Sequence, residues 1–296
     1  MSWRVSAVSL VSYDYRYLLG SISSYLTFVD ELILGVDSQG LSWSGGRVEI
    51  PPAFFQELRR LDETGAKIRL VSRPFYAASR TPMENDVAER NALSLEARPE
   101  NWIVSVDADE YLLNAAQFFR FLASVEHDDV DVYASWITSF KDLGDALLVI
   151  AAQSDGLLER FPIATRRRGG FVASRRTENK ELLSPGVALH YSWGRGEKEL
   201  HQKLLNWTHS HDFDVEAYFR FWRGVNARNY STVHRFHPIW PELWSRLVKV
   251  EKNDMANWDL WDLGYQPTRS VVRATRRLYR RVRARVRGAA ARSEAQ

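Results

Sequence analysis

Apolar and polar positions alternate with two different periods along the first 112 residues of the chain. Short runs of apolar, mostly β-branched residues predict buried strands at 4–11, 31–37, 67–71 and 102–106. Helices are predicted between these strands, from apolar residues at helical spacing and a Pro-Pro helix start, at 15–27, 51–61 and 84–97. Strands that alternate with helices form crossover units, so we predict an α/β fold with a mainly parallel sheet flanked by helices.

This alternation loosens after residue 112. One helical pattern and three apolar runs predict a helix at 115–125 and strands at 130–140, 146–151 and 186–191. From residue 197 the chain becomes aromatic and helical in pattern. Seven of the eleven Trp and six of the seven His lie between positions 190 and 261. We therefore divide the chain into the segments 1–112, 113–196, 197–266 and 267–296.

Composition places the chain among ordinary globular proteins. It has 296 residues, of which 45% are hydrophobic and 26% charged. The absence of cysteine excludes disulfides, cysteine nucleophiles and thiolate metal sites. We expect no signal peptide, because the first residues lack a basic stretch followed by an apolar one. We also expect no membrane-spanning helix, because no run of about 18 apolar residues occurs.

The segment 267–296 carries most of the positive charge. It contains ten Arg and one acidic residue, although the whole chain has a net charge of only +3, so the remainder is mildly acidic. Apolar residues recur every three or four positions between the arginines, which predicts a basic amphipathic helix. We favour an anionic membrane surface as its partner over nucleic acid. A disordered, solubilising tail is the other alternative.

Acidic residues follow two of the predicted strands. Asp107, Asp109 and Glu110 come directly after the strand at 102–106, and Asp37 ends the strand at 31–37. The carboxyl ends of parallel strands form the ligand-binding edge of such a sheet. Carboxylates this close repel one another unless a proton or a cation intervenes, and Mg²⁺ or Mn²⁺ is the simplest cation. The alternatives are a turn-forming role for Asp37 and the first turn of a helix for the others; for Glu110 we favour the helix start.

Four segments in the same order resemble a family 2-like glycosyltransferase with the GT-A fold. They are 8–14, 21–34, 89–93 and 105–110, of which the last two are similar to that family's Arg-Asn segment and its DxD motif. The resemblance continues more loosely through 190–195 and 203–207. It implies a Rossmann-like GT-A domain with a nucleotide-sugar-binding half at 1–112 and an acceptor-side half at 113–196. The aromatic helical region and the basic tail would then be additions to it.

The resemblance also implies roles for individual residues. Asp37 would contact the nucleobase or ribose of the donor, and Arg90 would lie near the nucleotide. Asp107 would contact ribose or a metal-bound water, and Asp109 would bind Mn²⁺ or Mg²⁺ at the diphosphate. His190, at the end of a short predicted strand, could be a further metal ligand. The alternatives are a solvated ion pair for Arg90 and a hydrogen-bonded, half-buried side chain for His190.

An inverting transfer needs a carboxylate that deprotonates the acceptor. Among the acids of the acceptor-side half we choose Glu178, because it lies between the Arg-rich segment 175–176 and the strand that carries His190. Trp193, Trp207 and Trp222 are predicted chiefly as packing residues, with stacking on a sugar or lipid acceptor as the alternative. Zinc is disfavoured because the histidines lack an acid-His spacing.

The function predicted on these grounds is that of a metal-dependent, inverting, hexosyltransferase-like glycosyltransferase of polysaccharide biosynthesis. It would move a sugar from a UDP- or GDP-linked donor to a glycan or lipid-linked acceptor. We expect it in the cytoplasm, bound peripherally to a membrane through its tail, with no nucleic acid as partner. One alternative is a phosphotransferase or phosphatase that uses Asp107 and Asp109. The other is a non-catalytic protein that binds membranes.

Overall fold

The computed structural model describes residues 4–151, 158–207, 209–210 and 212–252. Four parallel strands occupy one half of its central sheet, in the order β3-β2-β1-β4. They are β1 (Val5–Val11), β2 (Glu31–Asp37), β3 (Ile68–Arg73) and β4 (Trp102–Ser105). Every residue of β1 is buried, as expected for a central strand covered on both faces. This arrangement confirms the predicted α/β fold.

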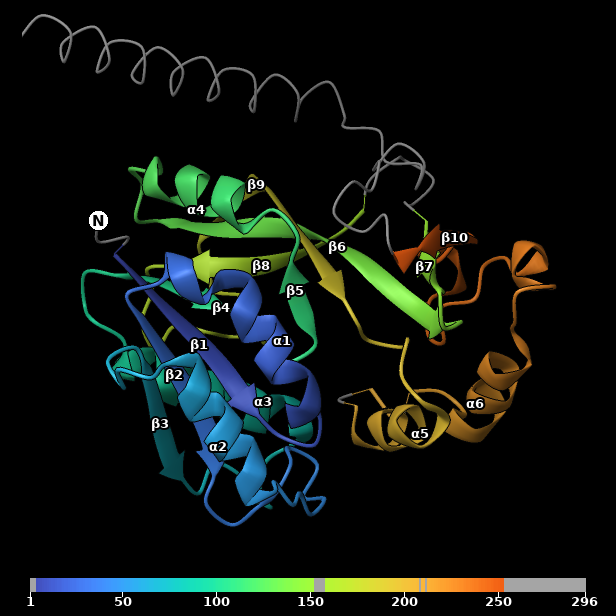
Figure 1. Ribbon diagram of the computed structural model, residues 1–296, viewed down its shortest axis with the longest axis horizontal. Coiled ribbons are helices and arrows are strands. Elements are labelled where there is room, and N and C mark those ends of the chain that lie inside the picture. Colours follow the sequence, from blue (N-terminus) through green and yellow to red (C-terminus); the bar gives the residue numbers. More distant parts are fainter. Residues whose placement is uncertain (1–3, 152–157, 208, 211, 253–296) are drawn as a thin grey trace, which may run out of the picture.

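Helices cover both faces of these strands (Figure 1). The helices α1 (Tyr15–Tyr25) and α2 (Pro52–Leu61) lie in front of them and α3 (Pro82–Glu96) lies behind. Consecutive residues of β1 belong to different apolar clusters, because they point to opposite faces of the sheet. Ala7 is in the cluster of Leu18 and Ile22 of α1, whereas Val8 is in the cluster of Leu93 of α3. The start of α3 is set by a capping box between Thr81 and Glu84 and by a proline in its first turn.

The other half of the sheet is mixed. Its elements are β5 (Glu110–Leu112), α4 (Ala115–Ala123), β6 (Val130–Asp142), β7 (Ala146–Ile150), β8 (Glu159–Thr165), β9 (Lys180–His190) and β10 (Leu247–Glu251). The strand β8 joins the halves by pairing antiparallel with both β4 and β6. The favoured helix-start interpretation of Glu110 is wrong, because this residue belongs to β5 and pairs with His190 of β9.

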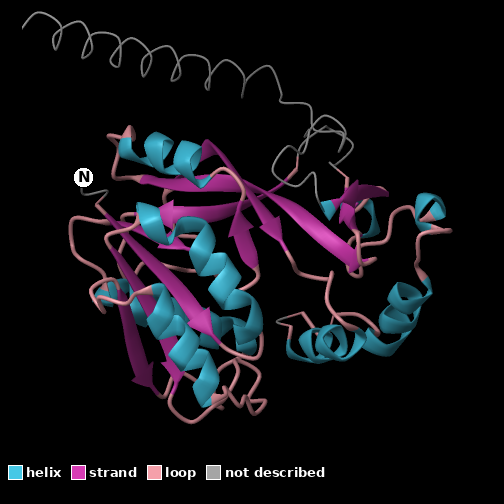
Figure 2. Ribbon diagram, in the orientation of Figure 1, coloured by secondary structure: helices cyan, strands magenta, loops and turns pink. Residues whose placement is uncertain are grey.

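A second apolar core lies at the far end of β6, beneath helices that Figure 2 shows apart from those flanking the parallel strands. These elements are α5 (Glu197–Asn206), α6 (Val215–Gly224) and the short 3₁₀ turns η2 (Tyr230–Thr232) and η3 (Pro241–Leu243); a further turn, η1 (Leu26–Phe28), follows α1. Trp193 and Trp222 are buried in this core, which confirms their packing role.

The basic segment 267–296 lies outside the described residues, as does the end of the aromatic region from 253 onward. Within the described part of the chain, no helix combines the length and apolar character needed to cross a membrane.

Candidate functional site

A cavity of about 380 Å³ opens where the parallel strands end. It is bounded by the ends of β1, β2 and β4, by α3, by the mixed strands, and by α5 and the aromatic residues of the second core. The carboxyl edge of the sheet is therefore also a wall of this cavity, as the strand order leads one to expect. Of the predicted site residues, the cavity is lined by Asp37, Arg90, Asp107, Asp109 and His190.

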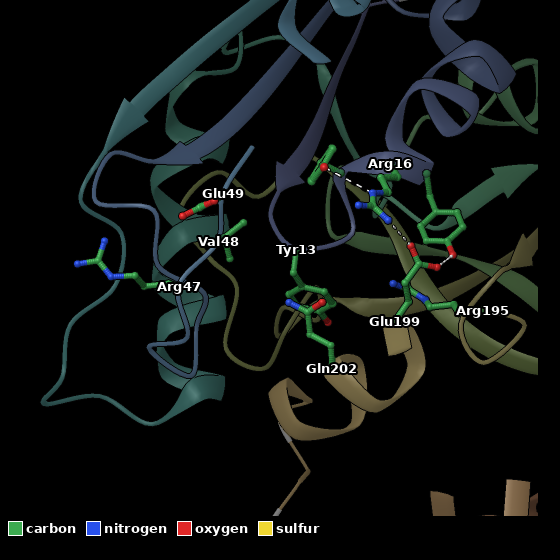
Figure 3. Close-up of a pocket in the computed structure, with 10 residues that line it drawn as sticks. Tyr13, Arg16, Arg47, Val48, Glu49, Arg195, Glu199 and Gln202 are labelled. Carbon is green, nitrogen blue, oxygen red and sulfur yellow. Dashed lines mark hydrogen bonds and ion pairs between the residues drawn. The ribbon is translucent and has the colours of Figure 1, made fainter. Parts of the chain in front are cut away.

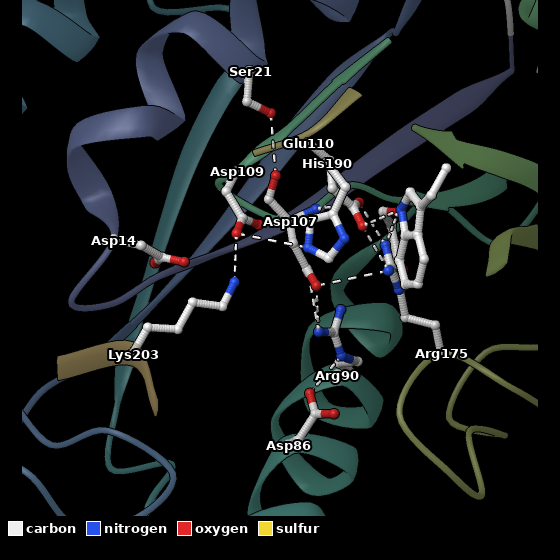
Figure 4. Close-up of polar contacts among 12 residues, drawn as sticks. Asp14, Ser21, Asp86, Arg90, Asp107, Asp109, Glu110, Arg175, His190 and Lys203 are labelled. Carbon is white, nitrogen blue, oxygen red and sulfur yellow. Dashed lines mark hydrogen bonds and ion pairs between the residues drawn. The ribbon is translucent and has the colours of Figure 1, made fainter. Parts of the chain in front are cut away.

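Asp107 faces two arginines at the end of β4. Arg90 rises from α3 to within 3.0 Å of its carboxylate and is held from below by Asp86, one helical turn earlier (Figure 4). Arg175 lies 3.8 Å from Asp107 on the other side. Burial opposes ionisation of Asp107, but Arg175 and Arg90 hold its pKa below the usual value. Arg90 is thus a buried site residue and no solvated ion pair.

Asp109 is the most heavily neutralised acid of the site. The Lys203 ammonium extends from α5 to 2.8 Å from its Oδ2, as Figure 4 shows, and Arg195 donates a hydrogen bond to the same oxygen. His190 Nε2 lies 3.7 Å away. Burial opposes ionisation, yet the charges of Lys203 and Arg195 hold the pKa of Asp109 well below its usual value. Asp109 is therefore ionised at neutral pH.

Glu110 has a structural task. Its carboxylate forms a two-pronged pair with Arg175 at 2.7 and 2.8 Å and accepts a hydrogen bond from the Trp136 indole at 2.9 Å. It also accepts the backbone N–H of Asp107 at 2.9 Å. Glu110 thereby fixes the backbone turn that carries Asp107 and Asp109 into the cavity.

His190 ends β9 beside these acids. Its ring lies 4.6 Å from the Trp136 ring, measured between centroids, and burial lowers its pKa to about 3. The imidazole is therefore neutral, which is the form that ligates metals. Its role as a ligand stays a prediction.

The carboxylate oxygens of the site are suitable ligands for a hard divalent cation that is bound together with a phosphate group. Such ions are commonly held by one or two carboxylates, waters and substrate phosphates. Asp107 and Asp109 face the same cavity, and the Oδ1 of Asp107 is buried without a hydrogen bond, although Arg90 is close enough for an ion pair. Within the described residues no three His or acidic side chains are arranged to hold a metal by themselves. Lys203 and Arg195 instead neutralise Asp109.

Two predicted residues are placed differently. The carboxylate of Asp37 accepts four backbone N–H groups, from Gln39, Leu41, Phe75 and Tyr76. It therefore ties together the loops after β2 and β3, as the turn-forming alternative requires, and its contact with a nucleotide stays a prediction. Glu178 is not brought to the cavity. Its side chain is 66% exposed and pairs with Arg167, so the geometry gives its proposed role as base no support.

The sequence did not identify three of the cations, Arg175, Arg195 and Lys203, or the acids Asp14 and Glu159. Arg195 and Lys203 lie in the two segments of looser resemblance, which was the available signal. Asp14 follows β1 and lies 3.6 Å from Arg195; burial raises its pKa to about 6. Nothing in the local sequence marks Arg175 or Glu159.

A smaller pocket of about 150 Å³ lies beside the cavity (Figure 3). Arg195 lines it and also holds Asp109, which lines the larger cavity, so Asp109 and its guanidinium partner connect the walls of the two spaces. Arg16 and Tyr17 bind the two oxygens of Glu199 on its wall. The pocket is thus an extension of the charged end of the site.

No family model matches the chain, and no curated protein is similar to it. Among solved structures, GalNAc-T7 with UDP, GalNAc and Mn²⁺ aligns over 73% of this chain and 50% of that one, at 10% identity and a TM-score of 0.38. Mannose-6-phosphate isomerase from Helicobacter pylori aligns over 51% of this chain and 56% of that one, at 10% identity and a TM-score of 0.31. The chain thus spans about half the length of these two proteins. Similarities this distant assign no activity to the chain.

Proposed function

We propose that the protein is a metal-dependent glycosyltransferase that uses a nucleotide-sugar donor and inverts the anomeric centre. One observation carries this proposal: two ionised carboxylates at the end of β4 and three largely buried cations line one cavity, while a fourth buried cation holds Asp109. The lining cations are Arg90, Arg175 and Lys203, and the fourth is Arg195. Acids and cations interleaved at a strand edge suit a ligand that is itself a metal–diphosphate pair.

The residues act mainly through charge. When the bond between the sugar and the diphosphate breaks, its electron pair stays on the leaving phosphate. Lys203 lines the cavity and is positioned to stabilise that charge at low dielectric, and it needs no reorganisation to do so. A divalent cation held by Asp107 and Asp109 would supply further charge stabilisation there. The acceptor is a glycan or lipid-linked hydroxyl.

Binding of the donor can be measured without knowing the acceptor. We expect UDP or GDP with Mn²⁺ to raise the melting temperature, and either component alone to raise it less. Saturation at 100 times the dissociation constant stabilises a protein by about 2.7 kcal/mol, which corresponds to roughly 5–10 °C for a domain of this size. Thermal-shift titrations with nucleoside diphosphates and nucleotide-sugars, with Mn²⁺ or EDTA, measure this. Equal shifts with and without Mn²⁺ contradict the metal role, and no shift with any nucleotide contradicts the function.

The basic segment 267–296 gives a separate prediction. If it binds an anionic surface, deleting it abolishes sedimentation with vesicles that contain phosphatidylserine, while donor turnover in solution is kept. The attraction falls with ionic strength, because each arginine near such a surface contributes about 1 kcal/mol that salt screens. Neutral phosphatidylcholine vesicles are the control. Unchanged sedimentation of the truncated chain shows that the tail is not the anchor.

A further inference from the structure

A carboxyl group of the mixed strands, Glu159, also lines the cavity, apart from the charged cluster at the end of β4. Glu159 begins β8 and is the register partner of Trp136 on β6. Directly paired residues of neighbouring antiparallel strands point to the same face of the sheet. Trp136 in turn contacts Glu110 and the ring of His190, so Glu159 lies on the face of the sheet that carries the donor-site residues.

The spacing of the strands determines how far Glu159 lies from His190 at the donor end of the site. The strands β8 and β9 lie on opposite sides of β6, and His190 of β9 pairs with Thr138 of β6. Adjacent strands are about 4.8 Å apart, so Glu159 and His190 are separated by roughly 10 Å across the sheet. The Trp136 ring lies between them on β6, and all three side chains line the same cavity. Thr138 lines the same cavity, and its buried hydroxyl has no hydrogen-bond partner among the described residues.

The cavity wall around Glu159 differs from the donor end. It is aromatic and comes mainly from the C-terminal region, with Trp207, Trp240 and Trp244 among the lining residues. The Trp240 ring stacks on His237 and is 48% exposed, at the rim. Flat aromatic faces with a few polar groups are typical of pockets that orient a ligand by shape and hydrogen bonds. The donor end, by contrast, is built from charges.

Glu159 is also without a counter-charge. It forms no ion pair within the described residues, and its polar partner is Trp244, which donates a hydrogen bond to it. Burial raises its pKa to about 7. The nearest arginine in the chain, Arg160, points to the opposite face by strand alternation. Arg175 is engaged by Glu110. The other titratable groups at this end of the cavity are His190, His209 and His237, and in the described part of the chain none of them forms an ion pair with Glu159.

We propose that Glu159 is the catalytic base, which receives the proton of an acceptor sugar hydroxyl held against the tryptophan wall. The inference rests on the proposed function and deepens it by assigning the acceptor end of the site. The acceptor O–H bond breaks and its proton passes to a Glu159 oxygen. The acceptor oxygen forms the bond to the anomeric carbon, whose bond to the diphosphate oxygen breaks, and that oxygen keeps the electron pair. Glu159 thus takes the proton at the acceptor end of the cavity, and Lys203 lines its donor end.

Glu159→Gln tests the proposal, because it keeps the size of the side chain and a hydrogen-bond acceptor for Trp244. Water can replace the acceptor, so the readout is hydrolysis of whichever nucleotide-sugar gives the largest thermal shift with the wild type. We expect kcat to fall about 10²–10⁴-fold with an unchanged donor KM and an unchanged donor-induced thermal shift. Glu57→Gln, an exposed glutamate of α2 paired with Arg60, is the matched control and stays at wild-type activity.

Azide separates a base from a merely structural carboxylate. Azide attacks carbon without losing a proton, so it restores turnover of the Gln variant and forms a glycosyl azide of inverted configuration. The wild-type rate should rise with pH through about 7, since the carboxyl must be ionised, and this limb should be absent from the azide reaction of the variant. Glu159→Asp should keep the rise of the rate with pH, because it keeps a carboxyl group, but with a lower kcat.

Three results with Glu159→Gln overturn the proposal: hydrolysis at the wild-type rate, loss of the donor-induced thermal shift, or no rescue by azide. If Glu159→Gln does not fold, a wild-type kcat in Glu159→Asp overturns it. If the wild type itself shows no shift with any nucleotide-sugar, the proposed function fails, and the assignment of Glu159 falls with it. A donor shift that survives while Glu159→Gln is fully active contradicts only the assignment of the base.

Discussion

Asp109→Asn is expected to lose the Mn²⁺-dependent part of the nucleotide thermal shift and to lower donor turnover by at least about 10²-fold, as for removal of one electrostatic contact to a transition state. It is also expected to destabilise the fold. Lys203 and Arg195 both bind the Oδ2 of Asp109 and are largely buried, so the neutral amide leaves two cations without their partner. Breaking a buried pair costs about 3–5 kcal/mol. Ligand binding and urea denaturation must therefore be measured on the same variant.

Asp131→Asn is the matched control for this substitution. Asp131 is as buried as Asp109 but binds the backbone N–H and hydroxyl of Thr177, away from the cavity. We expect it to lower stability while the response to Mn²⁺ and nucleotide is kept. If both variants lose the same stability and both keep the metal response, Asp109 is not a metal ligand. If Asp109→Asn alone loses the response, the metal role of the DxD acids is supported.

Arg175→Met is expected to destabilise the fold by about 3–5 kcal/mol, the cost of breaking a buried ion pair. Arg175 is 6% exposed, forms both bonds to the carboxylate of Glu110 and also donates to the backbone oxygen of Ser105. Its loss leaves Glu110 buried without a cation. Lysine is no conservative replacement, because an ammonium cannot form the two-pronged geometry. The midpoint of urea denaturation measures the effect.

A double-mutant cycle measures the contribution of the ion pair between Arg175 and Glu110 to the stability of the fold. Replacing a whole buried ion pair by neutral groups is often nearly neutral, so Arg175→Met with Glu110→Gln should recover much of the stability lost in Arg175→Met alone. A double variant whose loss is the sum of the single losses contradicts the pairing. Arg120→Met, on α4 and outside the cavity lining, serves as control and should change stability by less than about 0.5 kcal/mol.

The sequence predicted the parallel half of the sheet because that half is built from local patterns. The strands β1, β2 and β4 and the helix α3 were placed within a few residues by the length and period of their apolar runs. The strand β8 was missed, since a short strand between two others is stabilised by pairing partners far along the chain. Glu110 was read as a helix start because a buried glutamate in a strand needs a partner, and Arg175 is 65 positions away.

The candidate site divides in the same way. Asp107 and Asp109 were recognisable because the two acids and the strand that presents them are adjacent in the sequence. Glu178 was chosen for its proximity in the chain to His190, but proximity does not determine which way a side chain faces, and it lies exposed beside Arg167. Glu159, at the start of the unpredicted β8, lines the cavity instead.

The sequence alone thus determined the order of strands and helices and the pair of acids at the end of β4, because both depend on spacing between near neighbours. The tertiary structure decided how those acids are neutralised and that Glu159, among the described residues, has an indole rather than a cation as its polar partner. Lys203 reaches Asp109 across 94 positions, and Glu159 meets Trp244 through the packing of the second core. Coulomb attraction and the cost of desolvation depend on distance in space and on burial, which no spacing along the chain specifies.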